Sequence, residues 1–163
     1  MKRIIILTGL LCTLLFGGEG FGFKEERYVY SIDKTLSFTG HIEFSENGMN
    51  IEYTKPEKKR IEYTQTHLKI FDAAGELAQE IDLEADPGMK LYMQLLLWLY
   101  RGDIEALQRY FTVNKKGDEL HLDPIAPTDK VVTSVTVVQK EGKPSFIKTM
   151  MSNQNEISID IAR

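Results

Sequence analysis

Apolar and polar residues alternate with a period of two along much of the chain. Met49, Ile51 and Tyr53, for example, share one face of an expected strand, while Asn50 and Glu52 lie on its other face. This alternation is typical of a strand with one face in water and the other against a core. About ten such strands follow one another in hairpin order, which predicts an antiparallel sheet with one wet face and one apolar face. The clearest runs are 38–44, 49–54, 60–64, 68–70, 77–83, 119–123, 131–138, 145–151 and 157–161.

A helical segment interrupts the strand series once. Asp86-Pro87 is a helix-start signal, and residues 89–100 are apolar on nearly every side. Gly102 ends this helix, and a second short helix is expected over about 104–109. About 13 apolar residues make a helix of roughly 20 Å, which is too short to cross a bilayer. We therefore expect the first helix to pack on the apolar face of the sheet.

The dimensions of these elements imply that the sheet is curved. Ten strands about 4.8 Å apart form a sheet roughly 48 Å wide, whereas a helix with its side chains is about 10–12 Å wide. Two short helices cannot cover a flat sheet of that width, so the sheet must curl around them. The expected fold class is mainly β (α+β), with a curved antiparallel sheet and short helices over its apolar concave face.

The side chains expected to line the concave face are apolar, and none carries a charge. Two interpretations stay open, because periodicity does not separate them. One is an apolar cavity for a hydrocarbon chain, and the other is a well-packed core with no free space. Several methionines add adaptable side chains that suit irregular apolar ligands. The candidate lining residues are Phe44, Met49, Ile51, Tyr53, Ile61, Leu68, Ile70, Leu91, Leu95, Trp98, Leu99, Leu122, Ile157 and Ile159.

The first twenty residues differ in character from the rest of the chain. Lys2 and Arg3 precede an apolar run over residues 4–16, and small residues follow it. This is the pattern of a secretory signal peptide. We predict a cleaved signal peptide over 1–20 and a single domain over 21–163.

Charge and cysteine content follow from that division. The whole chain has a net charge of −4, and removing residues 1–20 leaves 18 basic and 23 acidic side chains, a net charge of −5. The single cysteine, Cys12, lies inside the apolar run and follows Leu11, where a bacterial lipoprotein carries a small residue. We therefore favour an ordinary signal-peptide cysteine over a lipidated one. An exported, cysteine-free, acidic domain suits a bacterial periplasm and argues against nucleic acid as a partner.

Catalytic motifs are scarce. Glu119, His121 and Asp123 share one face of an expected strand and could form a metal or acid–base cluster, but a solvated strand face is the favoured interpretation. There is no G-x-S-x-G motif and no glycine-rich phosphate loop in the sequence. We expect no enzymatic activity, no cofactor and no metal site.

A short basic cluster lies after the second expected strand. It consists of Lys55, Lys58, Lys59 and Arg60, and glutamates are interleaved with it. We interpret it as a solvated turn in preference to an anion site.

Several short segments occur in a characteristic order from residue 38 to the C-terminus. Together they resemble the LolA-type outer-membrane lipoprotein carriers and their shorter LolA-like relatives. The segments are Phe38-Thr39-Gly40, Tyr53-Thr54-Lys55-Pro56, Arg60-Ile61-Glu62-Tyr63, Ile70-Phe71-Asp72-Ala73-Ala74-Gly75, Gly102-Asp103-Ile104-Glu105-Ala106-Leu107 with Phe111, and Gly117-Asp118-Glu119-Leu120-His121-Leu122-Asp123-Pro124.

The resemblance implies an incomplete barrel of antiparallel strands, with helices forming a lid over an apolar cavity. It implies a monomeric periplasmic carrier that takes acylated lipoproteins or other lipids from an inner-membrane exporter to an outer-membrane acceptor. Shielding is needed because each methylene removed from water is worth about 0.8 kcal/mol. The alternative is a lipid or lipoprotein sensor, or an accessory subunit of a membrane lipid exporter.

Two departures from the family pattern concern the lid. The family's latch arginine corresponds to Lys55, whose point charge lacks the planar fork of a guanidinium group. The long N-terminal helix of typical carriers is also poorly supported, because Tyr28, Val29 and Tyr30 favour a strand.

Overall fold

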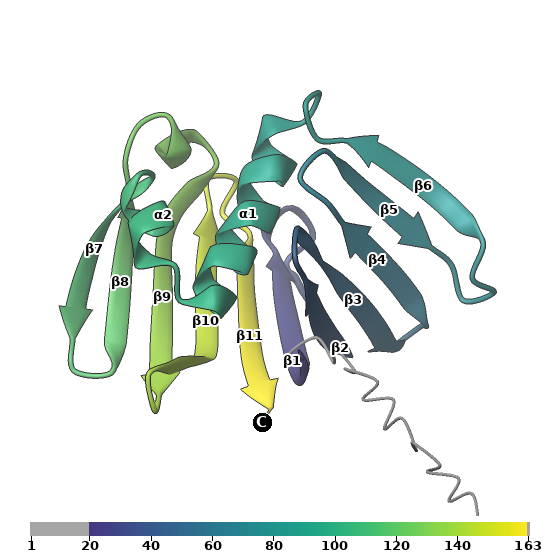
Figure 1. Cartoon of the computed structure of the whole chain (residues 1–163), viewed down its shortest axis with the longest axis horizontal. Coiled ribbons are helices and arrows are strands. Elements are labelled where there is room, and N and C mark those ends of the chain that lie inside the picture. Colours follow the sequence, from purple (N-terminus) through teal and green to yellow (C-terminus); the bar gives the residue numbers. More distant parts are fainter. Residues whose placement is uncertain (1–19, 163) are drawn as a thin grey trace, which may run out of the picture.

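A computed structural model describes residues 20–162, and these residues form one antiparallel sheet of 11 strands with two α-helices on its concave face (Figure 1). The expected signal peptide over 1–20 lies outside the described residues except for Gly20, where the first strand begins. The elements are β1 (Gly20–Val29), β2 (Lys34–Ser45), β3 (Gly48–Lys55), β4 (Lys59–Tyr63), β5 (His67–Phe71), β6 (Leu77–Asp82), α1 (Pro87–Arg101), α2 (Ile104–Gln108), β7 (Phe111–Lys116), β8 (Glu119–Pro124), β9 (Val132–Lys140), β10 (Lys143–Met151) and β11 (Glu156–Ala162), with 3₁₀ turns at Tyr30–Ile32 and Thr128–Lys130.

The sheet consists of two runs of hairpins that meet in its middle. The strand order is β6-β5-β4-β3-β2-β1-β11-β10-β9-β8-β7, so the first and last strands pair and the edges are β6 and β7. The β1–β11 ladder places Glu25 opposite Ile159 and Arg27 opposite Ile157. Hairpin order and an unclosed, curved sheet are thus confirmed, whereas the expected count of about ten strands is one too low.

The strand interpretation of the N-terminal segment is correct for Tyr28 and Val29, whereas Tyr30 begins a 3₁₀ turn. Phe21 and Phe23 alternate with Gly22 and Lys24 along β1, and Phe23 is buried while Lys24 is exposed. The continuous pairing of β1 with both β2 and β11 leaves this segment in the centre of the sheet, so a long helix does not form here.

The predicted helix is present, with a slightly longer extent. The Asp86 side chain accepts a hydrogen bond from the Met89 backbone N–H and so caps α1, Pro87 occupies the first turn, and Gly102 ends the helix with a φ of 67°. Arg101 donates to the backbone carbonyl oxygens of Ser45 and Glu46, at 2.6 and 3.1 Å, which ties the C-terminal end of α1 to the β2–β3 turn. No helix among residues 20–162 is long and apolar enough to span a membrane.

Helix α1 crosses the concave face near its middle and divides it into two regions (Figure 1). Under the half formed by β7–β10, most inward side chains are buried in a hydrophobic cluster. Under the half formed by β1–β6, a cavity remains between α1 and the strands. The packed core and the cavity, which the sequence left as alternatives, therefore coexist on opposite sides of α1. The packed half contains Leu95, Leu99, Leu107, Phe111, Leu122, Val135, Val137 and Ile147.

Candidate functional site

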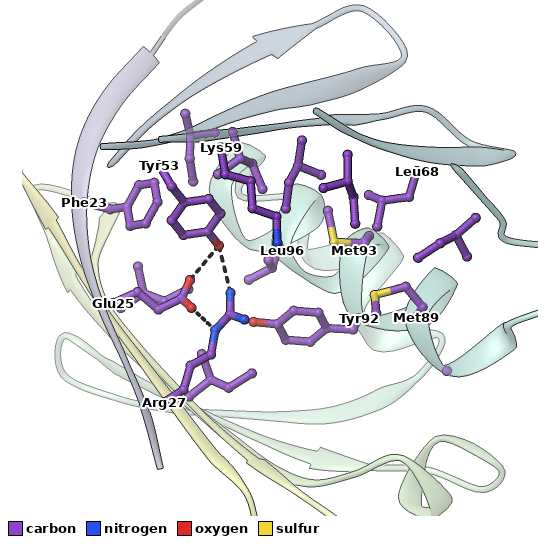
Figure 2. Close-up of a pocket in the computed structure, with 18 of the residues that line it drawn as sticks. Phe23, Glu25, Arg27, Tyr53, Lys59, Leu68, Met89, Tyr92, Met93 and Leu96 are labelled. Atoms are coloured by element: carbon purple, nitrogen blue, oxygen red, sulfur yellow. Dashed lines mark hydrogen bonds and ion pairs between the residues drawn. The ribbon is translucent and has the colours of Figure 1, made fainter. Parts of the chain in front are cut away.

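The cavity has a volume of about 440 Å³, which lies within the range of about 300–1,000 Å³ that is common for small-molecule sites. Its walls come from β1–β6, from β11 and from one face of α1 (Figure 2). Most of the lining is aliphatic or aromatic, with a few polar side chains gathered on one side. The lining residues are Phe23, Glu25, Arg27, Ile42, Ile51, Tyr53, Lys59, Ile61, Leu68, Ile70, Ile81, Asp86, Gly88, Met89, Tyr92, Met93, Leu96, Tyr100, Val131, Met151, Ile157 and Ile159.

One stripe of α1 faces this cavity. It consists of Met89, Tyr92, Met93, Leu96 and Tyr100, which recur at the three- and four-residue spacing of a single helix face. Two methionines in this stripe give the wall unbranched side chains that can adjust to different ligand shapes. The helix therefore presents a deformable apolar surface to the open half of the sheet.

A hydrogen-bonded cluster of three polar side chains interrupts the apolar lining. The Arg27 Nε donates to the Glu25 carboxylate, and the Arg27 Nη2 donates to the Tyr53 phenol oxygen at 2.8 Å. The Tyr53 hydroxyl in turn donates to the second carboxylate oxygen of Glu25 at 3.2 Å. Figure 2 shows this triangle closing between β1 and β3 at one end of the cavity. Both oxygens of the carboxylate are thus satisfied.

Partial burial of this cluster strengthens the interactions between its charged side chains. The Glu25 side chain is only 5% exposed, whereas the Arg27 side chain is 38% exposed. Burial acts to lower the pKa of Arg27, but the Tyr53 phenol and the Glu25 carboxylate outweigh it, so the pKa is raised overall. Arg27 also lies over the Phe38 ring, 4.7 Å from its centroid. The guanidinium is therefore held as a cation against aromatic and carboxylate surfaces.

The phenols of α1 add hydrogen-bonding groups to the same cavity. Burial raises the pKa of Tyr92 and of Tyr100, so both phenols remain protonated. Tyr92 interacts electrostatically with Arg27, and Figure 2 shows its hydroxyl beside the guanidinium. The Tyr100 hydroxyl is buried and has no hydrogen-bond partner among the described residues. The Tyr100 ring packs against Phe21 and Phe44, with ring centroids 4.9 and 5.6 Å away.

Comparison with known proteins gives little beyond this geometry. No protein-family model matches the chain, and no curated protein matches it. Among solved structures, the chain is similar to a domain from Vibrio parahaemolyticus assigned to outer membrane lipoprotein sorting. The alignment covers 90% of this chain and 84% of that chain, with 8% sequence identity and a TM-score of 0.39. A similarity this weak carries no argument about the present chain.

The structure divides the 14 lining candidates predicted from the sequence into two equal groups. Seven lie in the cavity wall, and these come from the strands alone. The other seven lie elsewhere, mostly in the packed core or on the opposite side of α1. The first group is Ile51, Tyr53, Ile61, Leu68, Ile70, Ile157 and Ile159, and the second is Phe44, Met49, Leu91, Leu95, Trp98, Leu99 and Leu122. Whether any of them contacts a lipid stays a prediction.

The helix residues in the second group lie on the wrong face of α1. At about 100° per residue, the stripe Leu91, Leu95, Trp98 and Leu99 is centred roughly 130° away from the stripe that lines the cavity. Leu95 and Leu99 are buried in the core, and Trp98 stacks on Tyr110 with ring centroids 5.1 Å apart. Because the helix is apolar all round, its sequence does not distinguish a face that meets side chains from a face that meets open space.

The expectation of an uncharged lining is wrong. Glu25, Arg27, Lys59 and Asp86 all line the cavity. The period-two pattern of β1 could have revealed two of them, because an inward face that begins with Phe21 and Phe23 continues through residues 25 and 27. Charged residues at such positions are normally assigned to solvent, and this preference hides the signal.

The basic cluster after β3 divides in a similar way. Lys59 is exposed, as the interpretation of the cluster as solvated predicts, but it lies at the start of β4 and also lines the cavity. Lys55 is exposed at the end of β3 and is not part of the cavity wall. Its role as a latch stays a prediction, while the Arg27 guanidinium lies beside Tyr92 of α1 (Figure 2).

The second candidate cluster lies on the opposite face of the sheet from the cavity. His121 and Asp123 are exposed, with the His121 Nε2 2.7 Å from a Glu119 carboxylate oxygen. Asn114 donates to Asp123 at 3.0 Å, a contact separate from the Glu119–His121 pair. Residues 20–162 contain no grouping of histidine, cysteine and acidic side chains that could hold a metal ion. This arrangement agrees with the interpretation as a solvated strand face.

Proposed function

We propose that this protein is a carrier that shields acyl chains of lipoproteins or other lipids from water. The cavity between α1 and β1–β6 carries this proposal. It is large enough for a ligand, most of its wall is apolar, and one side of it is formed by a methionine-containing helix face. Transferring about ten methylenes from water into such a wall contributes roughly 8 kcal/mol, and no directed chemistry is needed for that gain.

The position of Lys59 supports an opening of the cavity to solvent. This residue is exposed to solvent and also lines the cavity, so the space is continuous with the surface. A ligand can therefore enter and leave without unfolding of the sheet. A carrier needs this property, because it must release its cargo to an acceptor.

The cellular setting forms part of the proposal. We propose that the chain works in the periplasm, between an inner-membrane exporter and an outer-membrane acceptor, without enzymatic activity. Cargo would then move toward the site with the greater affinity, and nucleotide hydrolysis by this chain would not be needed. The signal-peptide pattern of residues 1–20 supports an exported location.

The direct test is to purify the protein from a periplasmic extract and identify bound lipids by mass spectrometry. Displacement of an acyl fluorophore then measures affinity. Ile70→Trp, which fills the cavity wall, is expected to abolish probe binding, whereas Thr112→Trp at an exposed position of β7 is a control that leaves it intact. Absence of both bound lipid and probe binding in the wild type would refute the proposal. Transfer between two vesicle populations separates a carrier from a sensor, which would bind lipid but not move it.

A further inference from the structure

Most of the polar lining gathers at one end of the cavity, and the opposite end is apolar apart from Asp86 beside Met89. Figure 2 shows Glu25, Arg27 and Tyr53 grouped on one side, while Leu68 and Met89 lie at the opposite side. A simple store for hydrocarbon would not require this asymmetry. It is the arrangement that suits a ligand with a head group and a tail.

The polar end retains hydrogen-bond donors that the protein itself does not use. Arg27 has five N–H donors, and its hydrogen bonds to Glu25 and Tyr53 engage only Nε and one Nη2 donor. These bonds do not engage Nη1, and Figure 2 shows the Tyr92 hydroxyl beside the guanidinium.

The local charge at this end is positive. Glu25 balances Arg27, and Lys59 adds a second cation whose side chain reaches into the cavity from β4 (Figure 2). The remaining charged lining residue, Asp86, already accepts a hydrogen bond from the Met89 backbone at the start of α1. One negative charge on a ligand would therefore neutralise the group formed by Glu25, Arg27 and Lys59.

From this we infer that the ligand is an amphiphile with a single anionic head group, a carboxylate or a phosphate, seated against Arg27, Lys59 and Tyr92. Its chain extends along the apolar end formed by Leu68, Ile70 and Met93. This inference rests on the proposed carrier function, and it adds a head-group preference to it. Arg27 supplies the planar donors and Lys59 the point charge, while Glu25 holds the guanidinium in place.

A purely structural role for the cluster is the competing explanation. In that case Glu25, Arg27 and Tyr53 would only join β1 to β3, and a neutral lipid would bind as well as an anionic one. The position of Lys59 favours the ligand-binding role, because this residue has no part in joining β1 to β3. The two explanations therefore differ in what removal of Lys59 does.

The test is competitive displacement of a neutral acyl fluorophore from the full mature chain. The competitors are palmitate, palmitoyl lysophosphatidic acid and monopalmitoylglycerol, which carry a carboxylate, a phosphate and a neutral head respectively. The wild type is expected to bind at least one anionic competitor roughly tenfold more tightly than the neutral one, as for a charge-assisted hydrogen bond. The stronger anionic competitor identifies which head group the site prefers.

Variants then assign that preference to the cluster. Glu25→Leu with Arg27→Met removes both charges of the pair together, which avoids leaving an unpaired buried carboxylate in the wall. This double variant and Lys59→Met are each expected to lower the anionic preference to about two- to threefold or less, while monopalmitoylglycerol still binds. Lys58→Met is the matched control, because Lys58 is an exposed neighbour that does not line the cavity. Thermal unfolding confirms that each variant is folded.

The outcomes separate the two proposals. Equal binding of neutral and anionic competitors by the wild type overturns the head-group inference and leaves the carrier function standing. A preference that survives both the double variant and Lys59→Met also overturns it. Failure of every competitor and of the fluorophore to bind the wild type refutes the carrier function and the inference together.

Discussion

The Arg27 guanidinium and the Tyr53 phenol meet across the wall of the cavity, with Nη2 and the hydroxyl oxygen 2.8 Å apart. The two residues lie on β1 and β3, which are not neighbours in the sheet, because β2 runs between them. Glycine at position 40 of β2 makes this approach possible. A Cβ atom there would lie 2.7 Å from the Phe23 ring, which itself packs edge-on against Tyr53.

Removal of the Tyr53 hydroxyl is expected to destabilise the fold. Tyr53→Phe leaves one Arg27 donor and one oxygen of the buried Glu25 carboxylate without their partner. The expected loss is about 1–3 kcal/mol of unfolding free energy, measured by urea denaturation. Tyr28→Phe is the control, because the Tyr28 hydroxyl donates to Asp33 at the surface, where water can replace the bond. A loss at Tyr53 no greater than that at Tyr28 would show that the cluster contributes nothing to stability.

A Cβ at position 40 is expected to be costly for a steric reason. In Gly40→Ala the new carbon would lie 2.2 Å from the Glu52 carbonyl oxygen on β3, so the backbone of two paired strands must shift. Overpacking of this kind typically costs about 1–3 kcal/mol, and contact with backbone places Gly40→Ala at the upper end.

The control for Gly40 is Gly22→Ala on the neighbouring strand. There the nearest atom, the Ala162 Cβ, lies 3.7 Å away, which is ordinary van der Waals contact. Chemical denaturation of both variants measures the difference. Equal stabilities of the two variants would contradict the close approach of β2 to β3.

Most of the strands could be predicted from the sequence, but the way in which they pair could not. Period-two alternation located most strands, because each strand has one face in water and one against apolar side chains. The pairing of β1 with β11 was not predictable in the same way, since no turn connects these strands and their register depends on the whole sheet. Gly40 lies in one of the segments that carries the family resemblance, and only the structure supplies a reason for the glycine.

The cavity itself was less predictable than the sheet. Strand residues such as Ile61 and Ile70 were assigned correctly to its wall, because the apolar side of a strand is unambiguous. Helix α1 is apolar all round, so its sequence could not say which face meets the core. Glu25 and Arg27 were missed because charge normally indicates solvent, whereas here the carboxylate is buried and paired.

Tryptophan fluorescence is expected to report ligand binding only when the indole is moved to the cavity. Trp98 stacks on Tyr110 and is not part of the cavity wall, so its emission is expected to change little when an acyl ligand binds. In a Trp98→Phe background, Met93→Trp places an indole on the lining face, and its emission is expected to shift to shorter wavelength as water is displaced. Titration with the same ligand checks both proteins. A large shift from Trp98 together with none from Met93→Trp would contradict the assignment of the two helix faces.

The division of α1 into a core face and a cavity face also makes a prediction about two leucine truncations. Their effects on stability and on ligand affinity are expected to follow opposite rank orders. Leu95 is fully buried in the packed core, so Leu95→Ala creates a new void and is expected to cost about 2–5 kcal/mol. Leu96 borders space that already exists, so Leu96→Ala loses fewer contacts and is expected to cost less. Affinity for an acyl probe should respond in the reverse order, because only Leu96 contributes to the wall. Urea denaturation and probe displacement on the same two variants give both measurements, and a shared rank order in stability and affinity would mean that α1 does not separate core from cavity.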